Sequence, residues 1–324
     1  MFKKYILVVS LLFAVYANAA QKLEKIIVAG PPANITHPIF KMIEDGVLKK
    51  YAKKIEFKMW KNPDQLKSMI INKEVDFVAV PTNVAAILYN KKQPIQLLNV
   101  SIWGILQTLV RDKNIDSLEK LKGKSIVVPW RGDMPDIVLR TIMKKEGISK
   151  KDINIIYVSS PMDAAQQLIM RRQDNGLFPE PAASMVLRKT KSFPASIIAP
   201  TYYRGVDLQK EWGKAFGIEG KIPQAGMAVV GDMRKNKKII EAFEKAYKKA
   251  MVWYKNHPKK SGKMVAKYIK MFTPDAVTDS ISHVQIDVVG AKDAKKDLEF
   301  FFDKLKEDNP KIIGEKIPDG GFYY

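Results

Sequence analysis

Short apolar runs alternate with helical patterns along the first 190 residues of this chain. The β-branched run KIIVA at 25–29 is closed by Gly30 and two prolines, and a helical stripe follows from Thr36 to Tyr51. The same order of strand, loop and helix recurs at 75–91, 125–146, 153–172 and 175–190. Parallel strands joined by helical crossovers produce this alternation, so the pattern predicts an α/β protein.

Longer features complete the pattern. Residues 98–111 predict an extended segment, and further short strands are expected at 197–200 and 225–230. From 234 to 308 the pattern is almost entirely helical. The aromatic residues of the terminal segment 318–324 are too apolar for a free tail, so we expect this segment to dock on the body of the protein.

The first twenty residues have the pattern of a secretory signal peptide. Lys3 and Lys4 precede an apolar stretch at 5–15, and small residues follow at 17–19. This stretch is shorter than the roughly 20 apolar residues that cross a membrane. We therefore expect a signal peptide at 1–19, cleavage after Ala19, and a periplasmic protein that is not inserted in the membrane.

The basic charge of the chain is large but dispersed. The sequence holds 55 Lys and Arg against 34 Asp and Glu, a formal charge of +21, and loss of the signal peptide would leave +19. Most of the cations are lysines spread over predicted helices. A nucleic-acid groove needs a basic stripe with interleaved aromatic residues, which this sequence lacks. The sequence therefore predicts no nucleic-acid partner.

The reactive residues exclude several classes of chemistry. The chain has no cysteine, which excludes disulfides, thiolate metal sites, cysteine nucleophiles and a lipid anchor on cysteine. Its histidines, His37, His257 and His283, are scattered, and the catalytic patterns HExxH, GxSxG and GxGxxG do not occur. We therefore expect neither a metal nor another cofactor, and the sequence does not favour an enzyme.

The predicted strands end in four polar or specialised loops, at 31–37, 81–83, 129–136 and 179–181. Open α/β sheets bind ligands at the carboxyl ends of their strands, and each loop leads into a helix N-terminus. Simple capping of those helices is the alternative role for the polar residues. The ligand-binding candidates are Asn34, Thr36, His37, Thr82, Asn83, Trp103, Trp130, Arg131, Asp133, Glu180 and Tyr202.

The third loop is the most informative. Trp130 offers a flat stacking surface, Arg131 offers a fork of donors for a carboxylate, sulfonate or phosphate, and Gly132 leaves room for close approach. In the alternative, Arg131 forms a local salt bridge with Asp133 or Asp136.

Other side chains complete the candidate cleft. Glu180 lies between two prolines, where its carboxylate can accept a hydrogen bond from an amine or a ring N–H. Trp60, Trp103, Tyr202 and Tyr203 would supply aromatic surface, although each is also typical of a core.

Several segments of the chain, taken in their order along the sequence, resemble the periplasmic substrate-binding proteins of ABC importers. The group in question includes nitrate, alkanesulfonate, taurine and thiamine-precursor binding proteins. The resemblance covers nearly the whole chain after the signal. It rests on the loop that enters the helix at Thr36, DFVAVPTNVAAIL from Asp76, LVRD at 109–112, SLEKLKGKSIVVP from Ser117, PEPAAS from Pro179 and IPDGGFYY from Ile317.

The resemblance implies a type II two-lobed α/β fold, with a mixed, mainly parallel sheet in each lobe and a ligand cleft between them. Lobe 1 would comprise 20–110 plus 204–324, and lobe 2 would comprise 111–203. It also implies a monomer that delivers a small molecule to a membrane permease with its ATPase.

The residues at 130–133 depart from the small Gly/Ser-rich anion-binding turn of many relatives. The departure favours a larger polar or heteroaromatic ligand, with an anionic or zwitterionic one included, over a simple oxyanion. Two alternatives stay open: a sensory binding protein for a membrane receptor, and an enzyme on the same scaffold. Scaffold relatives that are enzymes resemble cysteine-bearing catalysts, and this chain has no cysteine.

Overall fold

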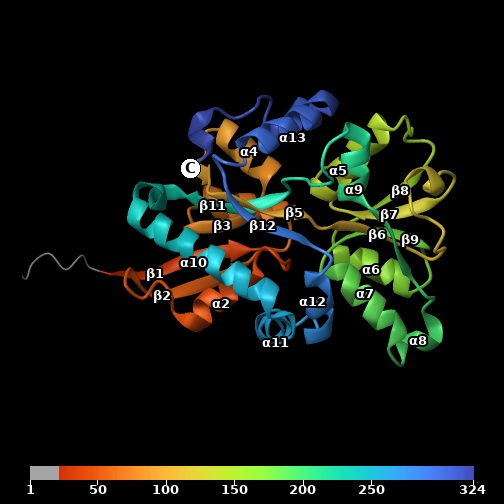
Figure 1. Cartoon of the computed structure of the whole chain (residues 1–324), viewed down its shortest axis with the longest axis horizontal. Coiled ribbons are helices and arrows are strands. Elements are labelled where there is room, and N and C mark those ends of the chain that lie inside the picture. Colours follow the sequence, from red (N-terminus) through yellow and green to blue (C-terminus); the bar gives the residue numbers. More distant parts are fainter. Residues whose placement is uncertain (1–21) are drawn as a thin grey trace, which may run out of the picture.

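Two β-sheets organise residues 22–324, the part of the chain that the computed structural model describes (Figure 1). The predicted signal peptide at 1–19 lies outside these residues. The larger, seven-stranded sheet contains β1 (Leu23–Gly30), β2 (Ala52–Met59), β3 (Phe77–Pro81), β4 (Ile95–Leu97), β5 (Asn99–Gly104), β11 (Ala225–Val230) and β12 (Gln285–Gly290). The five-stranded sheet contains β6 (Leu106–Val110), β7 (Ser125–Pro129), β8 (Asn154–Val158), β9 (Asn175–Pro179) and β10 (Tyr203–Asp207).

Both sheets are mixed. The larger sheet has the order β12-β5-β11-β3-β1-β2, with β4 beside β11. Its strand β1 runs parallel to β2 and β3, whereas β11 is antiparallel to β3, β4 and β5. The smaller sheet has the order β10-β6-β9-β7-β8. Strand β7 runs parallel to β8 and β9, and the other two pairs are antiparallel. The α/β fold with two mixed sheets is thus confirmed, with more antiparallel pairing than the sequence predicted.

Helices cover both faces of each sheet. The helices are α2 (His37–Asp45), α3 (Pro63–Ile71), α4 (Thr82–Asn90), α5 (Met134–Lys145), α6 (Pro161–Ile169), α7 (Ala182–Lys191), α8 (Ala195–Ile198), α9 (Leu208–Phe216), α10 (Lys237–Asn256), α11 (Pro258–Tyr268), α12 (Pro274–Ile281) and α13 (Lys295–Asp308). In Figure 1, α4 and α13 lie above the larger sheet and α2, α10 and α11 below it, while α5 and α9 lie above the smaller sheet and α6 and α7 below it. This layering buries the apolar faces of the sheets in continuous cores.

The structure corrects three predicted elements. The first helix ends at Asp45 because Gly46 takes a left-handed conformation at φ 59°, and the lysine-rich segment that follows is strand β2 at the edge of the sheet. The predicted helical region 234–308 contains the edge strand β12. Residues 197–200 are not a strand, since α8 ends there and β10 begins later. Edge strands expose one side, so their weak apolar pattern is easily mistaken for a helix surface.

The chain passes between the sheets at Ile105, which separates β5 from β6, and returns after β10 through α9. The predicted lobe limits at 110 and 204 therefore fall inside the smaller sheet. The Gln209 side chain fixes the first passage, because its amide accepts from the Leu106 N–H at 3.0 Å and donates to the Leu106 carbonyl at 3.1 Å. Position 104 requires glycine, because a Cβ on residue 104 would lie 2.3 Å from Gln209 Cγ.

The C-terminal segment docks on the larger lobe, as the sequence predicts. Tyr323 forms a parallel bridge with Leu97, and the Tyr324 N–H donates to the Leu97 carbonyl at 2.9 Å. Phe322 is fully buried and contacts Tyr89 edge-on. The terminus is therefore part of the core.

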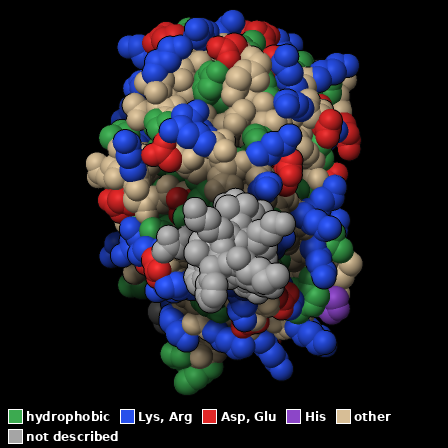
Figure 2. Space-filling view, turned by 90° about the vertical axis from the view of Figure 1, so that its left-hand side faces the viewer, with side chains coloured by type: hydrophobic (Ala, Val, Ile, Leu, Met, Phe, Trp, Pro, Cys, Tyr) green, Lys and Arg blue, Asp and Glu red, His purple; other side chains and the backbone are tan. Residues whose placement is uncertain are grey.

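The charged surface is dispersed on the face that Figure 2 shows, where lysine and arginine side chains are interleaved with acidic ones. No helix among residues 22–324 is long and apolar enough to cross a membrane. Within the same residues, no three His, Asp or Glu side chains are grouped to hold a metal ion.

Candidate functional site

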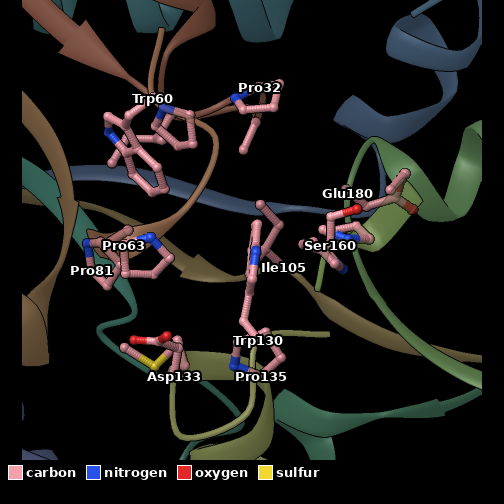
Figure 3. Close-up of a pocket in the computed structure, with 18 of the residues that line it drawn as sticks. Pro32, Trp60, Pro63, Pro81, Ile105, Trp130, Asp133, Pro135, Ser160 and Glu180 are labelled. Atoms are coloured by element: carbon pink, nitrogen blue, oxygen red, sulfur yellow. The ribbon is translucent and has the colours of Figure 1, made fainter. Parts of the chain in front are cut away.

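A cavity of about 240 Å³ lies between the two sheets, at the carboxyl ends of their parallel strands (Figure 3). The larger sheet contributes the loops after β1, β2 and β3, and the smaller sheet contributes the loops after β7, β8 and β9. Ile102, Ile105 and Leu106 also line it, so the passage between the sheets forms part of the wall. All four loops that the sequence singled out reach this cavity.

The wall is mostly apolar. Seven prolines line it: Pro31, Pro32, Pro63, Pro81, Pro135, Pro161 and Pro179. Trp60, Trp130, Met134, Met162 and Phe272 supply larger apolar surfaces. Trp60 is held in place by a hydrogen bond from its indole nitrogen to the Ala79 carbonyl at 3.2 Å. Such a wall suits a ligand with a flat or aliphatic apolar body.

The turn after β7 is organised by Asp136. This buried carboxylate accepts from the Gly132 N–H at 2.7 Å, from Arg140 Nε at 2.9 Å and from the Tyr157 hydroxyl at 2.9 Å. Trp130 takes a left-handed conformation at φ 56°, which carries the chain around the turn. Asp136 therefore fixes the turn that carries Trp130, whose buried Nε1 has no hydrogen-bond partner among the described residues.

Asp133 lies at the start of α5, but its side chain does not cap the helix and forms no hydrogen bond or ion pair with any described residue. Its carboxylate lines the cavity (Figure 3). Burial raises the pKa of Asp133 to about 6, the nearby Lys67 opposes that shift, and Asp64 and Asp136 add to it. The cavity thus contains a half-buried carboxylate that nothing neutralises directly.

Glu180 is fully buried at the opposite wall and is paired. Its Oε1 lies 2.5 Å from Arg204 Nη1, and its Oε2 accepts from the Ser184 N–H at 3.1 Å. Burial raises the pKa of Glu180, and the Arg204 charge acts against that shift. Arg204 is also fixed by Gln107 and Ser184, at 2.6 and 2.8 Å.

Gln224 is a polar wall residue that the sequence did not suggest. It is 1% exposed, and both atoms of its side-chain amide lack a hydrogen-bond partner among residues 22–324. Its backbone is fixed between two segments, because its N–H donates to the Ile102 carbonyl and its own carbonyl accepts from the Thr82 N–H, both at 3.0 Å. A buried free amide costs folding free energy unless a ligand or water pairs with it.

The candidates of the first loop point away from the cavity into the protein. Asn34 donates to the Tyr254 hydroxyl at 2.9 Å and to Ser280 Oγ at 3.0 Å, and His37 Nδ1 forms a hydrogen bond of 2.8 Å with the same tyrosine hydroxyl. Thr36 is buried against Gly30. These side chains fix the loop to α10 and α12, and only its prolines, Ala33 and Ile35 line the cavity.

Four further candidates also bond to groups outside the cavity. Thr82 donates to the Pro223 carbonyl, Asn83 to the Ile312 carbonyl, Trp103 to the Asp287 carbonyl and Tyr202 to the Leu168 carbonyl, and none of the four lines the cavity. Arg131 is exposed.

The Arg131 guanidinium lies 5.1 Å from the centre of the Tyr157 ring, and it pairs with neither Asp133 nor Asp136, which is held by Arg140. Of the eleven candidates, Trp130, Asp133 and Glu180 line the cavity. Backbone alternation and capping signals identify loops, but only the packed neighbours decide which way each side chain points.

Ion pairs join the two lobes on either side of the cavity. On one side, Arg188 of α7 pairs with Asp279 of α12 through Nε at 2.5 Å and Nη2 at 2.9 Å, and with Asp275 at 3.2 Å. On the other side, Arg140 and Lys144 of α5 each lie 3.4 Å from Asp308 at the end of α13. Charged contacts therefore connect the two lobes at both edges of the cavity.

Solved structures similar to this chain include an ABC transporter protein and proteins that bind alkanesulfonate and nitrate. An ABC transporter protein from Parabacteroides distasonis superposes with a TM-score of 0.77 at 22% identity, covering 93% of this chain and 99% of its own. The alkanesulfonate-binding protein SsuA from Xanthomonas axonopodis pv. citri, bound to MOPS, gives 0.66 at 14% identity, covering 89% and 94%. The periplasmic nitrate-binding protein NrtA from Synechocystis PCC 6803 gives 0.69 at 12% identity, covering 89% and 82%. The chain has the two-lobed periplasmic binding protein fold.

The NMT1/THI5-like family model matches residues 54–261, more than half of the chain. The protein therefore belongs to the NMT1/THI5-like family, in agreement with the resemblance seen in the sequence. No curated protein sequence matches it significantly.

Proposed function

We propose that this protein is an extracytoplasmic solute-binding protein, which captures a small, largely apolar and heteroaromatic molecule between its lobes and delivers it to an ABC permease. The observation that carries the proposal is the cavity itself: six strand-end loops, three from each sheet, converge on one apolar space with few polar groups. Ligand sites in binding proteins have this composition.

The connections between the sheets support a hinged mechanism. We place the hinges at Ile105 and between β10 and β11, because these are the segments where the chain passes from one sheet to the other. Ile105 also lines the cavity, and its carbonyl accepts from the Glu180 N–H at 3.1 Å. A ligand that contacts both walls would favour the closed arrangement over an open one, since it gains all its contacts only there.

A binding role fits the chemistry of the wall better than catalysis does. Glu180 is held by Arg204 and Ser184, and the Ser160 hydroxyl is committed to Asp163 as a helix cap. Neither is paired with a base in the way that activates a nucleophile. The signal peptide pattern, the periplasmic location and a monomeric state belong to the same proposal.

The test is ligand capture by the purified protein. We expect native mass spectrometry against a panel of apolar and heteroaromatic metabolites to show one molecule bound per chain, with a raised Tm. Trp130→Ala should abolish that binding, whereas Trp253→Ala, a change on α10 outside the cavity, should retain it. Absence of any stoichiometric ligand across the panel would contradict the proposal.

A further inference from the structure

The charges of the cavity wall restrict the ligand further than the fold does. The ionisable residues of the wall are Lys61, Asp133 and Glu180. Lys61 is exposed to solvent, and Glu180 is neutralised by Arg204. Asp133 therefore remains as the half-buried charge without a partner, and it is negative.

Arg131, the cation that the sequence offered for an anionic ligand, does not reach this space. Its guanidinium lies on the Tyr157 ring, and Arg140 is committed to Asp136 and Asp308. Among the described residues, no buried cation faces the cavity free of an acidic partner. An anion placed here would lose its hydration and meet a carboxylate, which is unfavourable at both steps.

Building on the proposed function, we infer that the ligand is an organic cation: a flat apolar body against Trp60, Trp130 and the prolines, with a basic nitrogen at the Asp133 carboxylate and an uncharged polar edge at the Gln224 amide. Asp133 is suited to this role because it neither caps α5 nor pairs with another side chain. A protonated nitrogen would supply the missing counter-charge. Gln224 can both donate and accept, so it recognises an uncharged group such as a ring nitrogen or an amide.

A matched set of aromatic probes tests the charge directly. Benzamidine, benzamide and benzoate present the same ring with a positive, a neutral and a negative group. We expect titration calorimetry on the purified protein to rank benzamidine above benzamide, and benzamide above benzoate. Loss of one charge-assisted hydrogen bond corresponds to a change of about tenfold or more in affinity.

Variants locate the effect. Asp133→Asn should reduce benzamidine affinity by about tenfold and leave benzamide affinity nearly unchanged. Asp64→Asn is the matched control, because it removes a nearby negative charge that does not line the cavity, and it should preserve the ranking. Gln224→Leu should weaken benzamide, whose uncharged amide suits Gln224, more than benzamidine, whose single polar group is placed at Asp133.

The pH dependence of benzamidine affinity provides an independent test. Protonation of Asp133 removes the counter-charge, so benzamidine should bind more weakly as the pH falls from about 8 to about 5, whereas benzamide should not change. The charged groups facing Asp133 are Lys67 and Asp64 on α3 and Asp136 on α5. Asp64→Asn separates the contribution of Asp64 to this pH dependence from that of Asp133.

Three results would overturn the inference: tighter binding of benzoate than benzamidine, an unchanged ranking in Asp133→Asn, or no binding of benzamidine at millimolar concentration. The proposed function fails separately, when the metabolite panel yields no ligand at all. A captured sulfonate or carboxylate that depends on Trp130 would leave the binding function standing and refute the cationic class.

Discussion

The Asp136 carboxylate accepts from the Gly132 N–H at 2.7 Å, whereas the carboxylate of Asp133, the residue that directly follows Gly132, forms no hydrogen bond or ion pair with any described residue. The two acids therefore have separate roles. Asp136 is structural, since Arg140 and Tyr157 also bind it, whereas Asp133 is left free at the cavity wall. This division makes the loop between β7 and α5 both rigid and available to a ligand.

Replacement of Asp136 should be costly. Asp136→Ala removes a buried acceptor from three partly buried hydrogen bonds and is expected to lower the free energy of unfolding by about 3 kcal/mol or more. Denaturant titration followed by circular dichroism measures it. Asp116→Ala, which removes an exposed i,i+4 partner of Lys120, should cost less than about 0.5 kcal/mol. Equal losses in the two variants would contradict the structural role of Asp136.

Stability should depend on pH through His37. Burial lowers its pKa to about 3, while the unfolded chain keeps the ordinary value near 6.5. Between these values the unfolded state binds the proton and the folded state does not. The free energy of unfolding should therefore fall as the pH falls from about 6.5 towards 3, by at most about 1.4 kcal/mol per pH unit from this residue.

His37→Asn tests that dependence. Its amide oxygen can accept from Tyr254 in place of Nδ1 but does not titrate, so the slope below about pH 6.5 should be reduced relative to the natural protein. His257→Asn, at an exposed histidine, should keep the natural slope. A His37→Asn variant with an unchanged slope would refute the assignment.

The Arg188 contacts across the lobes should favour closure. Arg188→Met removes the pairs with Asp275 and Asp279 and is expected to weaken ligand binding by about two- to fivefold, with a larger radius of gyration in X-ray scattering of the free protein. Arg111→Met removes a comparably exposed pair with Asp174 within the smaller lobe and should change neither quantity. High salt should diminish the difference, because these pairs are exposed. A matching response from Arg111→Met would show that the effect is not one of lobe closure.

The passage between the sheets should not tolerate a side chain at Gly104. Gly104→Ala places a Cβ 2.3 Å from Gln209 Cγ and should lower the free energy of unfolding by about 1–3 kcal/mol. Gly320→Ala, where nothing lies within 4 Å of the added Cβ, should be nearly neutral. The double variant Gly104→Ala with Gln209→Ala should recover part of the loss if the contact is the cause.

Local pattern was enough to predict the class of fold. Strands at 125–129 and 225–230 are closed by turn residues or prolines and are buried in the interior of a sheet, where an uninterrupted apolar run is required. Local pattern also marks the start of α6, because Ser160 stands directly before Pro161, a typical helix start, and its hydroxyl accepts from the Asp163 N–H at 3.2 Å. The strands that escaped prediction, β2 and β12, lie at sheet edges, where neighbouring strands rather than their own residues decide the conformation.

For the site, the sequence by itself identified four of the six loops that meet, because parallel strands bring their carboxyl ends to one side of each sheet. Only the tertiary structure decided which side chains face the cavity. Asn34 and His37 find buried partners on α10 and α12, over 200 residues away, and turn inward, whereas the prolines beside them have no side-chain donor to bury and remain at the wall. Gln224 faces the cavity because its backbone groups are fixed by strand β5 and by the start of helix α4, both distant in the sequence, a constraint that no local pattern contains.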